Sequence, residues 1–122
     1  MRWWLYLQGK PNVLVGSIGL NAIARGPFQN TLLGYSLEGK LQGQGLMQEA
    51  LSAVIAHAFS TEINLHRIQA NVRPDNLRSL RVLERLGFER EGFARDYLFI
   101  HDKWHDHIMF ALRNENFKGI PI

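Results

Sequence analysis

The sequence predicts an α+β fold, built on a mixed and mostly antiparallel sheet with one parallel strand–helix–strand crossover. Three observations lead to it. Strand-like apolar runs fill most of the first 37 positions, a 3.6-residue apolar period begins at residue 46, and two further strand-like runs follow residue 92. The expected order of elements is therefore β-β-β-α-β-α-β-β.

Three strands are expected before the first helix. Residues 3–8 are rich in aromatic and aliphatic side chains, residues 9–12 (GKPN) have turn chemistry, and residues 13–20 resume a strand-like run, which together predict a hairpin. Gly26 and Pro27 mark a loop, and residues 30–37 predict the third strand.

Apolar residues recur with a period near 3.6 from Leu46 to Phe59 and indicate an amphipathic helix whose stripe belongs to the core. Residues 68–72 predict a short strand that Pro74 stops. Strand, helix and strand around residues 32–72 then form the right-handed parallel crossover.

A second helix is expected to begin at Asp75 or Asn76 as the N-cap and to end at Gly87. Residues 93–100 and 104–112 predict a final hairpin that turns at residues 101–103. The leucines expected along one side of the second helix are Leu77, Leu80, Leu83 and Leu86.

Composition narrows the class of protein. With 122 residues and 46% apolar content, the chain suits one compact domain. The absence of cysteine excludes disulfides, thiolate zinc sites and a cysteine nucleophile, and it fits a reducing cytoplasm. No apolar run approaches the roughly 18–20 residues of a membrane span. A net charge of +3 without a Lys/Arg block suits an anionic ligand and predicts no direct nucleic-acid binding.

The segment KLQGQGL at residues 40–46 lies between a predicted strand and a predicted helix. Glycines let backbone approach a ligand closely, and the first N–H groups of a helix have no internal acceptor, so this loop suits a phosphate. It is neither a GxxxxGK[ST] loop nor a GxGxxG motif, since position 48 is glutamine. A plain helix-entry turn is the alternative.

A second segment has Asn76 and Ser79 followed by Leu83 and the pair at residues 87–88 (GF). It resembles the N-x-x-S…L-x-x-x-G-F signature of the GNAT superfamily, and the glycine loop resembles its Q/R-x-x-G-x-G/A signature, with Lys40 at the Gln/Arg position. The segments HRIQAN at 66–71 and GFEREG at 87–92 are similar to the RimJ/RimL branch, most of all to its RimJ members. The resemblance implies the three-layer α/β acyl-CoA N-acyltransferase fold and acetylation of N-terminal α-amines of ribosomal proteins.

The resemblance also implies a departure. Full-length members begin with a further strand and two helices, which form one wall of the acceptor groove, so residues 1–122 are expected to be a single GNAT domain that lacks them. An uncovered edge strand beside Trp3 and Trp4 favours association, such as a homodimer or a covering partner.

The resemblance implies acetyl-CoA as the cosubstrate, with direct attack of the amine on the thioester and a strand N–H stabilising the oxyanion. Ser79 matches the proposed general acid, and Asn76 serves as helix cap, pantetheine contact or both. Arg78 and Arg81 reach the 3′-phosphate or are simply solvated. The implied cofactor-binding residues are Tyr35, Ser36 and Leu37 for the acetyl and pantetheine part, Gln42, Gly43, Gln44, Gly45 and Leu46 for the pyrophosphate, and Asn76 and Ser79 from the second helix.

The general base is not identified by the sequence. The glutamate that RimL-like enzymes carry after the second helix corresponds to Leu98, and Asp96 faces the same side as Leu98 only if no bulge intervenes. A terminal α-amine is roughly 10–15% neutral at pH 7, whereas lysine is below about 0.1% neutral. An α-amine acceptor therefore needs less help from a side-chain base.

His101, His105 and His107 with Asp102 and Asp106 invite a metal hypothesis. Turn and sheet-surface positions explain them better, and no metal is expected. Three functions stay open: N-terminal acetylation of a ribosomal protein, acetylation of a small-molecule amine or lysine, and a catalytically silent acyl-CoA-binding or ribosome-associated module.

Overall fold

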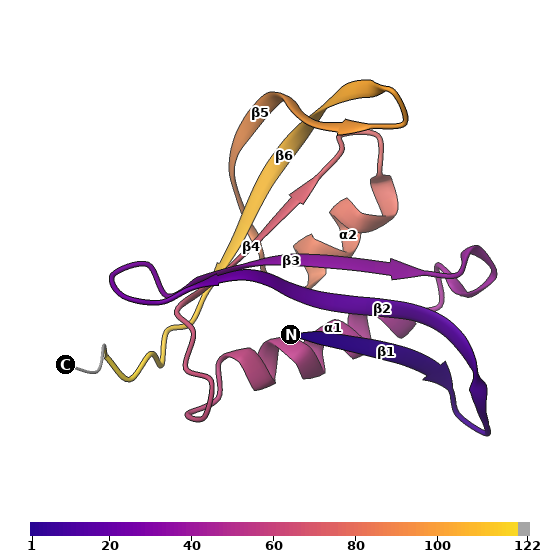
Figure 1. Ribbon diagram of the computed structural model, residues 1–122, viewed down its shortest axis with the longest axis horizontal. Helices are drawn as coiled ribbons and strands as arrows, with labels where there is room; N and C mark the ends of the chain where they lie inside the picture. The colour runs from indigo at the N-terminus through magenta and orange to yellow at the C-terminus, as the bar shows by residue number, and fades with distance from the viewer. Residues whose placement is uncertain (120–122) are drawn as a thin grey trace.

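The computed structural model describes residues 1–119, and residues 120–122 of the predicted domain lie outside the described part. Six strands form one sheet in the order β1-β2-β3-β4-β6-β5 (Figure 1). The strands are β1 (Arg2–Leu7), β2 (Lys10–Ala24), β3 (Asn30–Leu37), β4 (Arg67–Val72), β5 (Glu89–Ile100) and β6 (Lys103–Arg113). The helices are η1 (Gly39–Leu41), α1 (Leu46–Ala58) and α2 (Leu77–Arg85).

The sheet is antiparallel except between β3 and β4, which pair in parallel. The helix α1 lies between these two strands in the chain and makes the crossover, so the predicted α+β class and the single parallel unit are confirmed. Within residues 1–119, no helix is long and apolar enough to cross a membrane.

The two faces of the sheet differ in chemistry. One face packs against α1 and α2 through a continuous apolar cluster that includes Leu33, Leu51, Ile68 and Leu83. Strand alternation sends the residues between these positions to the other face, where β4 presents Arg67, Gln69 and Asn71. We call these the helix face and the open face.

Several boundaries differ from the predictions. β2 runs on to Ala24 and β5 begins at Glu89, because pairing with neighbouring strands extends both beyond their most apolar stretches. Leu77 is 57% exposed and does not belong to the core, unlike the other three leucines of the predicted stripe. The last hairpin turns at His101 and Asp102, which both have positive φ, as a two-residue loop of this kind requires.

Candidate active site

The sheet opens between β3 and β4. Their parallel pairing runs from Asn30 with Arg67 to Leu33 with Ala70 and goes no further, although both strands continue. In Figure 1 the group β1–β3 and the group β4–β6 diverge beyond this point, with α2 drawn in the opening. Residues 34–37 of β3 therefore border a gap in the ladder.

The glycine loop connects this end of β3 to α1. Gly45 is the residue before the helix, with φ of 75°, and Gly43 has φ of 81°. Both values lie in the left-handed region that side chains with a Cβ rarely adopt, and the space around each missing Cβ is open. The loop therefore leaves the N-terminus of α1 uncovered, where backbone N–H groups lack intrahelical acceptors.

One cavity of about 570 Å³ joins the two features. It extends from the splayed end of β3 across the glycine loop to α2. The residues that line it are Tyr35, Ser36, Leu37, Leu41, Gln42, Gly43, Gly45, Leu46, Met47, Gln48, Asn76, Arg78, Ser79, Arg81, Val82 and Arg85. The first turn of the apolar stripe of α1 thus faces the cavity rather than the core alone.

All the sequence-predicted site residues except Gln44 lie on this cavity. The Gln44 side chain instead donates from Nε2 to the carbonyl oxygen of Lys40 at 3.2 Å, within the loop. Gln42 also supports the loop, since its Nε2 donates to the Leu37 carbonyl at 3.0 Å. The two glutamines therefore hold the shape of the loop through their side chains.

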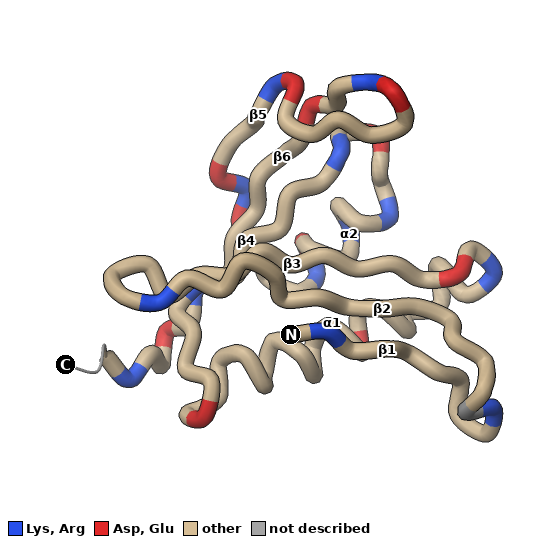
Figure 2. Tube along the Cα trace, viewed as in Figure 1, with Lys and Arg blue, Asp and Glu red and all other residues tan. Residues whose placement is uncertain are grey.

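The helix α2 gives the cavity its positive charge. Basic and acidic residues are scattered over the chain (Figure 2), but the charged residues that line the cavity, Arg78, Arg81 and Arg85 of this helix, are all basic. Arg78 Nη1 donates to Gln42 Oε1 at 2.5 Å and links α2 to the glycine loop. Arg85 was missed by the sequence interpretation, although its spacing of seven residues from Arg78 places both on one helix side.

The N-terminus of α2 carries the second predicted motif. Asn76 is the N-cap, and its Oδ1 accepts the backbone N–H of Ser79 at 3.3 Å. This bond uses the Ser79 main chain and leaves its hydroxyl on the cavity wall. The cap interpretation of Asn76 is therefore confirmed, while Ser79 is not occupied by its own helix.

Tyr35 places a hydroxyl group beneath this wall. Burial raises the pKa of the phenol, and the neighbouring Ser79 side chain offsets part of that rise. The approach to Ser79 falls short of a hydrogen bond, since among residues 1–119 the buried Tyr35 Oη has no partner. A buried hydroxyl without a partner is costly to the fold, so its position beside the cavity suits a ligand that completes it.

The region expected to supply a base is altered by a bulge. The pairing of β5 with β6 shifts between Ala94 and Leu98, and Asp96 has φ of 46° within the shift. The backbone N–H of Asp96 donates to the carboxylate of Asp106 at 2.9 Å, on an exposed part of the hairpin. A bulge therefore intervenes, and the condition under which Asp96 would share the side of Leu98 is not met.

Two of the hairpin histidines, His105 and His107, are engaged with backbone. His105 Nε2 lies 3.0 Å from the Ile100 carbonyl oxygen, and His107 Nδ1 lies 3.0 Å from the carbonyl oxygen of His105. Within residues 1–119, no three His, Asp or Glu side chains are arranged to hold a metal ion. These rings belong to the hairpin structure.

Comparison with known proteins finds one family model and several relatives that match this chain. Residues 1–89 match the family model of the acetyltransferase (GNAT) domain. The chain is 48% identical over 99 residues to [ribosomal protein uS5]-alanine N-acetyltransferase of Escherichia coli (strain K12), which covers 81% of the chain and 50% of that relative.

Two solved structures agree in shape. A ribosomal-protein-S5-alanine acetyltransferase from Vibrio fischeri superposes with a TM-score of 0.84 at 40% identity, over 87% of this chain and 57% of that one. Mycobacterium smegmatis RimJ in complex with CoA-disulfide gives 0.81 at 32% identity, over 91% and 53%. The chain spans about half the length of the curated relatives that it matches.

Proposed function

The chain belongs to the GNAT acetyltransferase family, and we propose that it transfers the acetyl group of acetyl-CoA to the N-terminal α-amine of a ribosomal protein. The observation that carries the proposal is the shared cavity. It brings the uncovered N-terminus of α1, the splayed end of β3 and the Ser79 hydroxyl together in one space.

The lining of the cavity fits acetyl-CoA. Backbone N–H groups at residues 42–46 would bind the pyrophosphate, which the positive end of α1 favours. Arg78, Arg81 and Arg85 offer charge to the 3′-phosphate. The end of β3 at residues 35–37 has no ladder partner on the side of β4, so its backbone can hydrogen-bond the pantetheine and acetyl part. Leu46 and Val82, which both line the cavity, would contact the apolar parts of the pantetheine.

The reaction needs little beyond position and proton transfer. A neutral amine attacks the thioester carbonyl carbon, the N–C bond forms and a β3 backbone N–H stabilises the oxyanion. The C–S bond then breaks, and the Ser79 hydroxyl gives a proton to the leaving thiolate. The amine nitrogen loses its proton to water, and water returns a proton to the Ser79 oxygen, so the proton count balances.

The acceptor assignment rests on the relatives and on pKa arithmetic. The Escherichia coli relative is described as acting on an alanine of ribosomal protein uS5, and a terminal α-amine is the more readily deprotonated acceptor. A ribosomal protein as acceptor would place the reaction in the cytoplasm.

The test begins with calorimetric titration of acetyl-CoA. It continues with an assay of acetyl transfer to a peptide that begins with alanine, against the same peptide with a blocked N-terminus and an internal lysine. We expect binding, and transfer to the free α-amine only. Absence of binding would refute the proposal; binding without transfer would favour a silent acyl-CoA-binding module, and equal transfer to lysine would favour a broader amine acceptor.

A matched pair of glycine variants locates the binding. Gly45→Ala and Gly26→Ala both put a Cβ on a residue of positive φ with open space around it, at 75° and 64°. The backbone strain is therefore similar, about 1 kcal/mol, but only Gly45 lies on the cavity. We expect at least tenfold weaker acetyl-CoA binding for Gly45→Ala and unchanged binding for Gly26→Ala.

We include self-association in the proposal. β1 is an edge of the sheet, and its Trp4 is 57% exposed. An exposed aromatic edge strand favours pairing with a second copy. Sedimentation velocity over a range of concentrations would detect the homodimer, and a constant monomer would remove this part of the proposal.

A further inference from the structure

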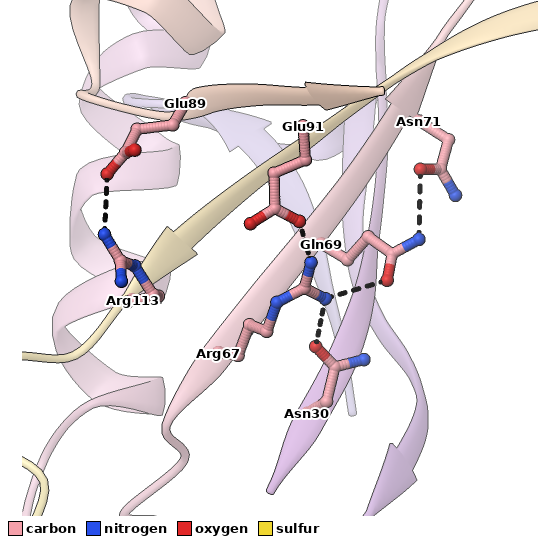
Figure 3. Close-up of polar contacts among 7 residues, drawn as sticks. All are labelled: Asn30, Arg67, Gln69, Asn71, Glu89, Glu91 and Arg113. Atoms are coloured by element: carbon pink, nitrogen blue, oxygen red, sulfur yellow. Dashed lines mark hydrogen bonds and ion pairs between the residues drawn. The ribbon is translucent and has the colours of Figure 1, made fainter. Parts of the chain in front are cut away.

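A chain of hydrogen bonds crosses the open face of the sheet at β4 (Figure 3). Arg67 Nη1 donates to Gln69 Oε1 at 2.9 Å, Gln69 Nε2 donates to Asn71 Oδ1 at 3.2 Å, and Asn71 Nδ2 donates to Tyr97 Oη at 3.2 Å. Arg67 is itself held by Asn30, at 3.0 Å, and by an ion pair with Glu91. This chain of hydrogen bonds starts at the fixed guanidinium of Arg67 and ends at the phenol of Tyr97.

The cation fixes the direction of every bond in this chain. A guanidinium can only donate, so Gln69 must present its oxygen to Arg67 and its NH₂ to Asn71. Asn71 is then oriented in the same sense and presents its NH₂ to Tyr97. A flip of either amide would place two acceptors or two donors against each other. Tyr97 Oη therefore acts as an acceptor in the chain and keeps its second lone pair and its hydrogen for another partner.

The last bond of this hydrogen-bond chain, from Asn71 to Tyr97, lies near the opening between β3 and β4. Ala70 is the last β4 residue paired with β3, and Asn71 is the next residue along. Tyr35 points to the helix face, like its pairing partner Ile18, whereas Asn71 points to the open face. Tyr97 Oη, which is bonded to Asn71, thus lies on the open face beside the first β4 residue beyond the pairing with β3, on the side opposite to Tyr35.

The position of Tyr97 on the open face depends on a bulge in β5. Ala94 pairs with His107 and Leu98 pairs with His105, so residues 95–97 stand opposite Asp106 alone and two of them are extra to the ladder. Tyr97 is half-buried within this bulge, and its ring lies 5.5 Å from the ring of His107, which is 3% exposed. The Tyr97 ring is packed and its hydroxyl is hydrogen-bonded. Its neighbour Leu98 has no polar group that could bind an acceptor.

We propose that Tyr97 Oη accepts an N–H of the attacking amine, and that Arg67, Gln69 and Asn71 are positioning residues that hold this oxygen in place. The inference rests on the proposed acetyl transfer and adds the residue that meets the acceptor. A neutral amine must direct its lone pair at the carbonyl carbon, so its N–H groups are best held by oxygen lone pairs. A cationic side chain at this place would instead compete for the nucleophile's lone pair.

The test compares Tyr97→Phe with Tyr6→Phe, an exposed tyrosine on β1. For a peptide that begins with alanine, we expect kcat/KM about tenfold lower in Tyr97→Phe, with acetyl-CoA affinity unchanged, and no change in Tyr6→Phe. Gln69→Leu breaks the chain without touching Tyr97, and we expect a smaller loss in kcat/KM for the peptide, again with unchanged acetyl-CoA affinity. Equal kcat/KM in Tyr97→Phe and the unchanged chain overturns the inference.

Binding of the peptide to the chain saturated with CoA provides a second readout, measured by calorimetry. We expect several-fold weaker peptide binding in Tyr97→Phe than in the unchanged chain. An unchanged chain that binds CoA but neither binds nor acetylates the peptide overturns the inference and leaves the cofactor site standing. An unchanged chain that binds neither ligand overturns the proposed function itself.

Discussion

The helix face and the open face of this sheet present different kinds of chemical group. On the helix face, the cavity is shaped mainly by backbone, glycines and two helices, with three arginines of α2 on its wall and an apolar core beneath. On the open face, side chains of β4 and β5 bond to one another in a directed chain. Backbone sites tolerate changes in most side chains, whereas a directed chain of side chains depends on each of its members.

This contrast also separates the two substrates in the proposed reaction. A large, invariant cosubstrate suits a site of backbone donors, because pyrophosphate recognition needs only N–H groups and space. A varied acceptor suits a site of side chains, because side chains can be exchanged without rebuilding the fold. The predictions below test whether the two faces behave as differently as their construction suggests.

The largest effect is expected from Ser79→Ala on the helix face. Loss of a general acid costs roughly a hundredfold or more in rate, so kcat should fall by that factor while acetyl-CoA affinity stays the same. The Asn76 cap bonds the Ser79 backbone N–H and survives the substitution. Steady-state kinetics at saturating peptide measures it.

Ser52→Ala is the matched control, since Ser52 is an exposed helical serine on α1 that bonds only the Gln48 carbonyl. It should have wild-type kcat. An unchanged kcat in Ser79→Ala would remove the general-acid role and leave Ser79 as a wall of the cavity.

The next effect compares stability across the sheet with two neighbouring residues of β3. Leu33 is buried in the apolar cluster, whereas Leu32 is half-buried on the open face. Leu33→Ala should lower the free energy of unfolding by about 2–5 kcal/mol, and Leu32→Ala by about 1 kcal/mol or less. Urea unfolding with a common m-value measures both. Similar losses would mean that the open face is packed as tightly as the core.

The helix face could be predicted from the sequence and the open face could not. The apolar period of residues 46–59 and the glycines at 43 and 45 are local patterns, and each implies its structure without knowledge of the remainder of the chain. Asn76 and Ser79 are likewise three residues apart on one helix. Local patterns therefore indicated the glycine loop and the two helix starts, whereas the β3 residues at 35–37 and the role of Ser79 came from the resemblance to the family.

The hydrogen bonds that run from Arg67 to Tyr97 on the open face correspond to no local sequence pattern. Gln69 and Asn71 look like ordinary polar positions of a half-buried strand, and their partner Tyr97 is brought to them by a bulge in β5. Strand alternation alone, carried from Leu98, would have placed Tyr97 on the opposite face. Alternation in β4 was a usable signal, since residues 67, 69 and 71 are all long and polar.

A smaller effect on stability is expected from removing Arg67, which holds the hydrogen bonds of the open face. Arg67→Met leaves Gln69 and the buried Asn30 (3% exposed) without their donor. The expected loss is about 1–3 kcal/mol of unfolding free energy. Thermal or urea unfolding of the free chain measures it.

Arg113→Met provides the control, because the Arg113–Glu89 pair in Figure 3 is 60% and 68% exposed. An exposed pair of this kind contributes at most about 1 kcal/mol. Equal losses in the two variants would show that the directed chain adds nothing beyond a surface ion pair.

The smallest effect concerns the Tyr35 hydroxyl, a buried polar group on the helix face. It is buried without a partner within residues 1–119, so Tyr35→Phe should stabilise the free chain, by about 1 kcal/mol. The same variant should bind acetyl-CoA more weakly than the unchanged chain if the ligand completes this hydroxyl. Destabilisation of the free chain would contradict the absence of a partner.

The pH dependence of stability gives an independent check on Tyr35. Burial raises the phenol pKa in the folded chain above its usual value near 10, so between the two pKa values the folded state keeps a proton that the unfolded state has lost. Ionisation of Tyr35 therefore takes no stability from the folded chain below pH 10, and the unfolding free energy falls as the pH rises from there toward the folded-state pKa. Tyr35→Phe should flatten the fall in unfolding free energy above pH 10, relative to Tyr6→Phe, which removes an exposed phenol instead. Identical alkaline slopes in the two variants would mean that the Tyr35 phenol is solvated in the free chain and is not the buried group described above.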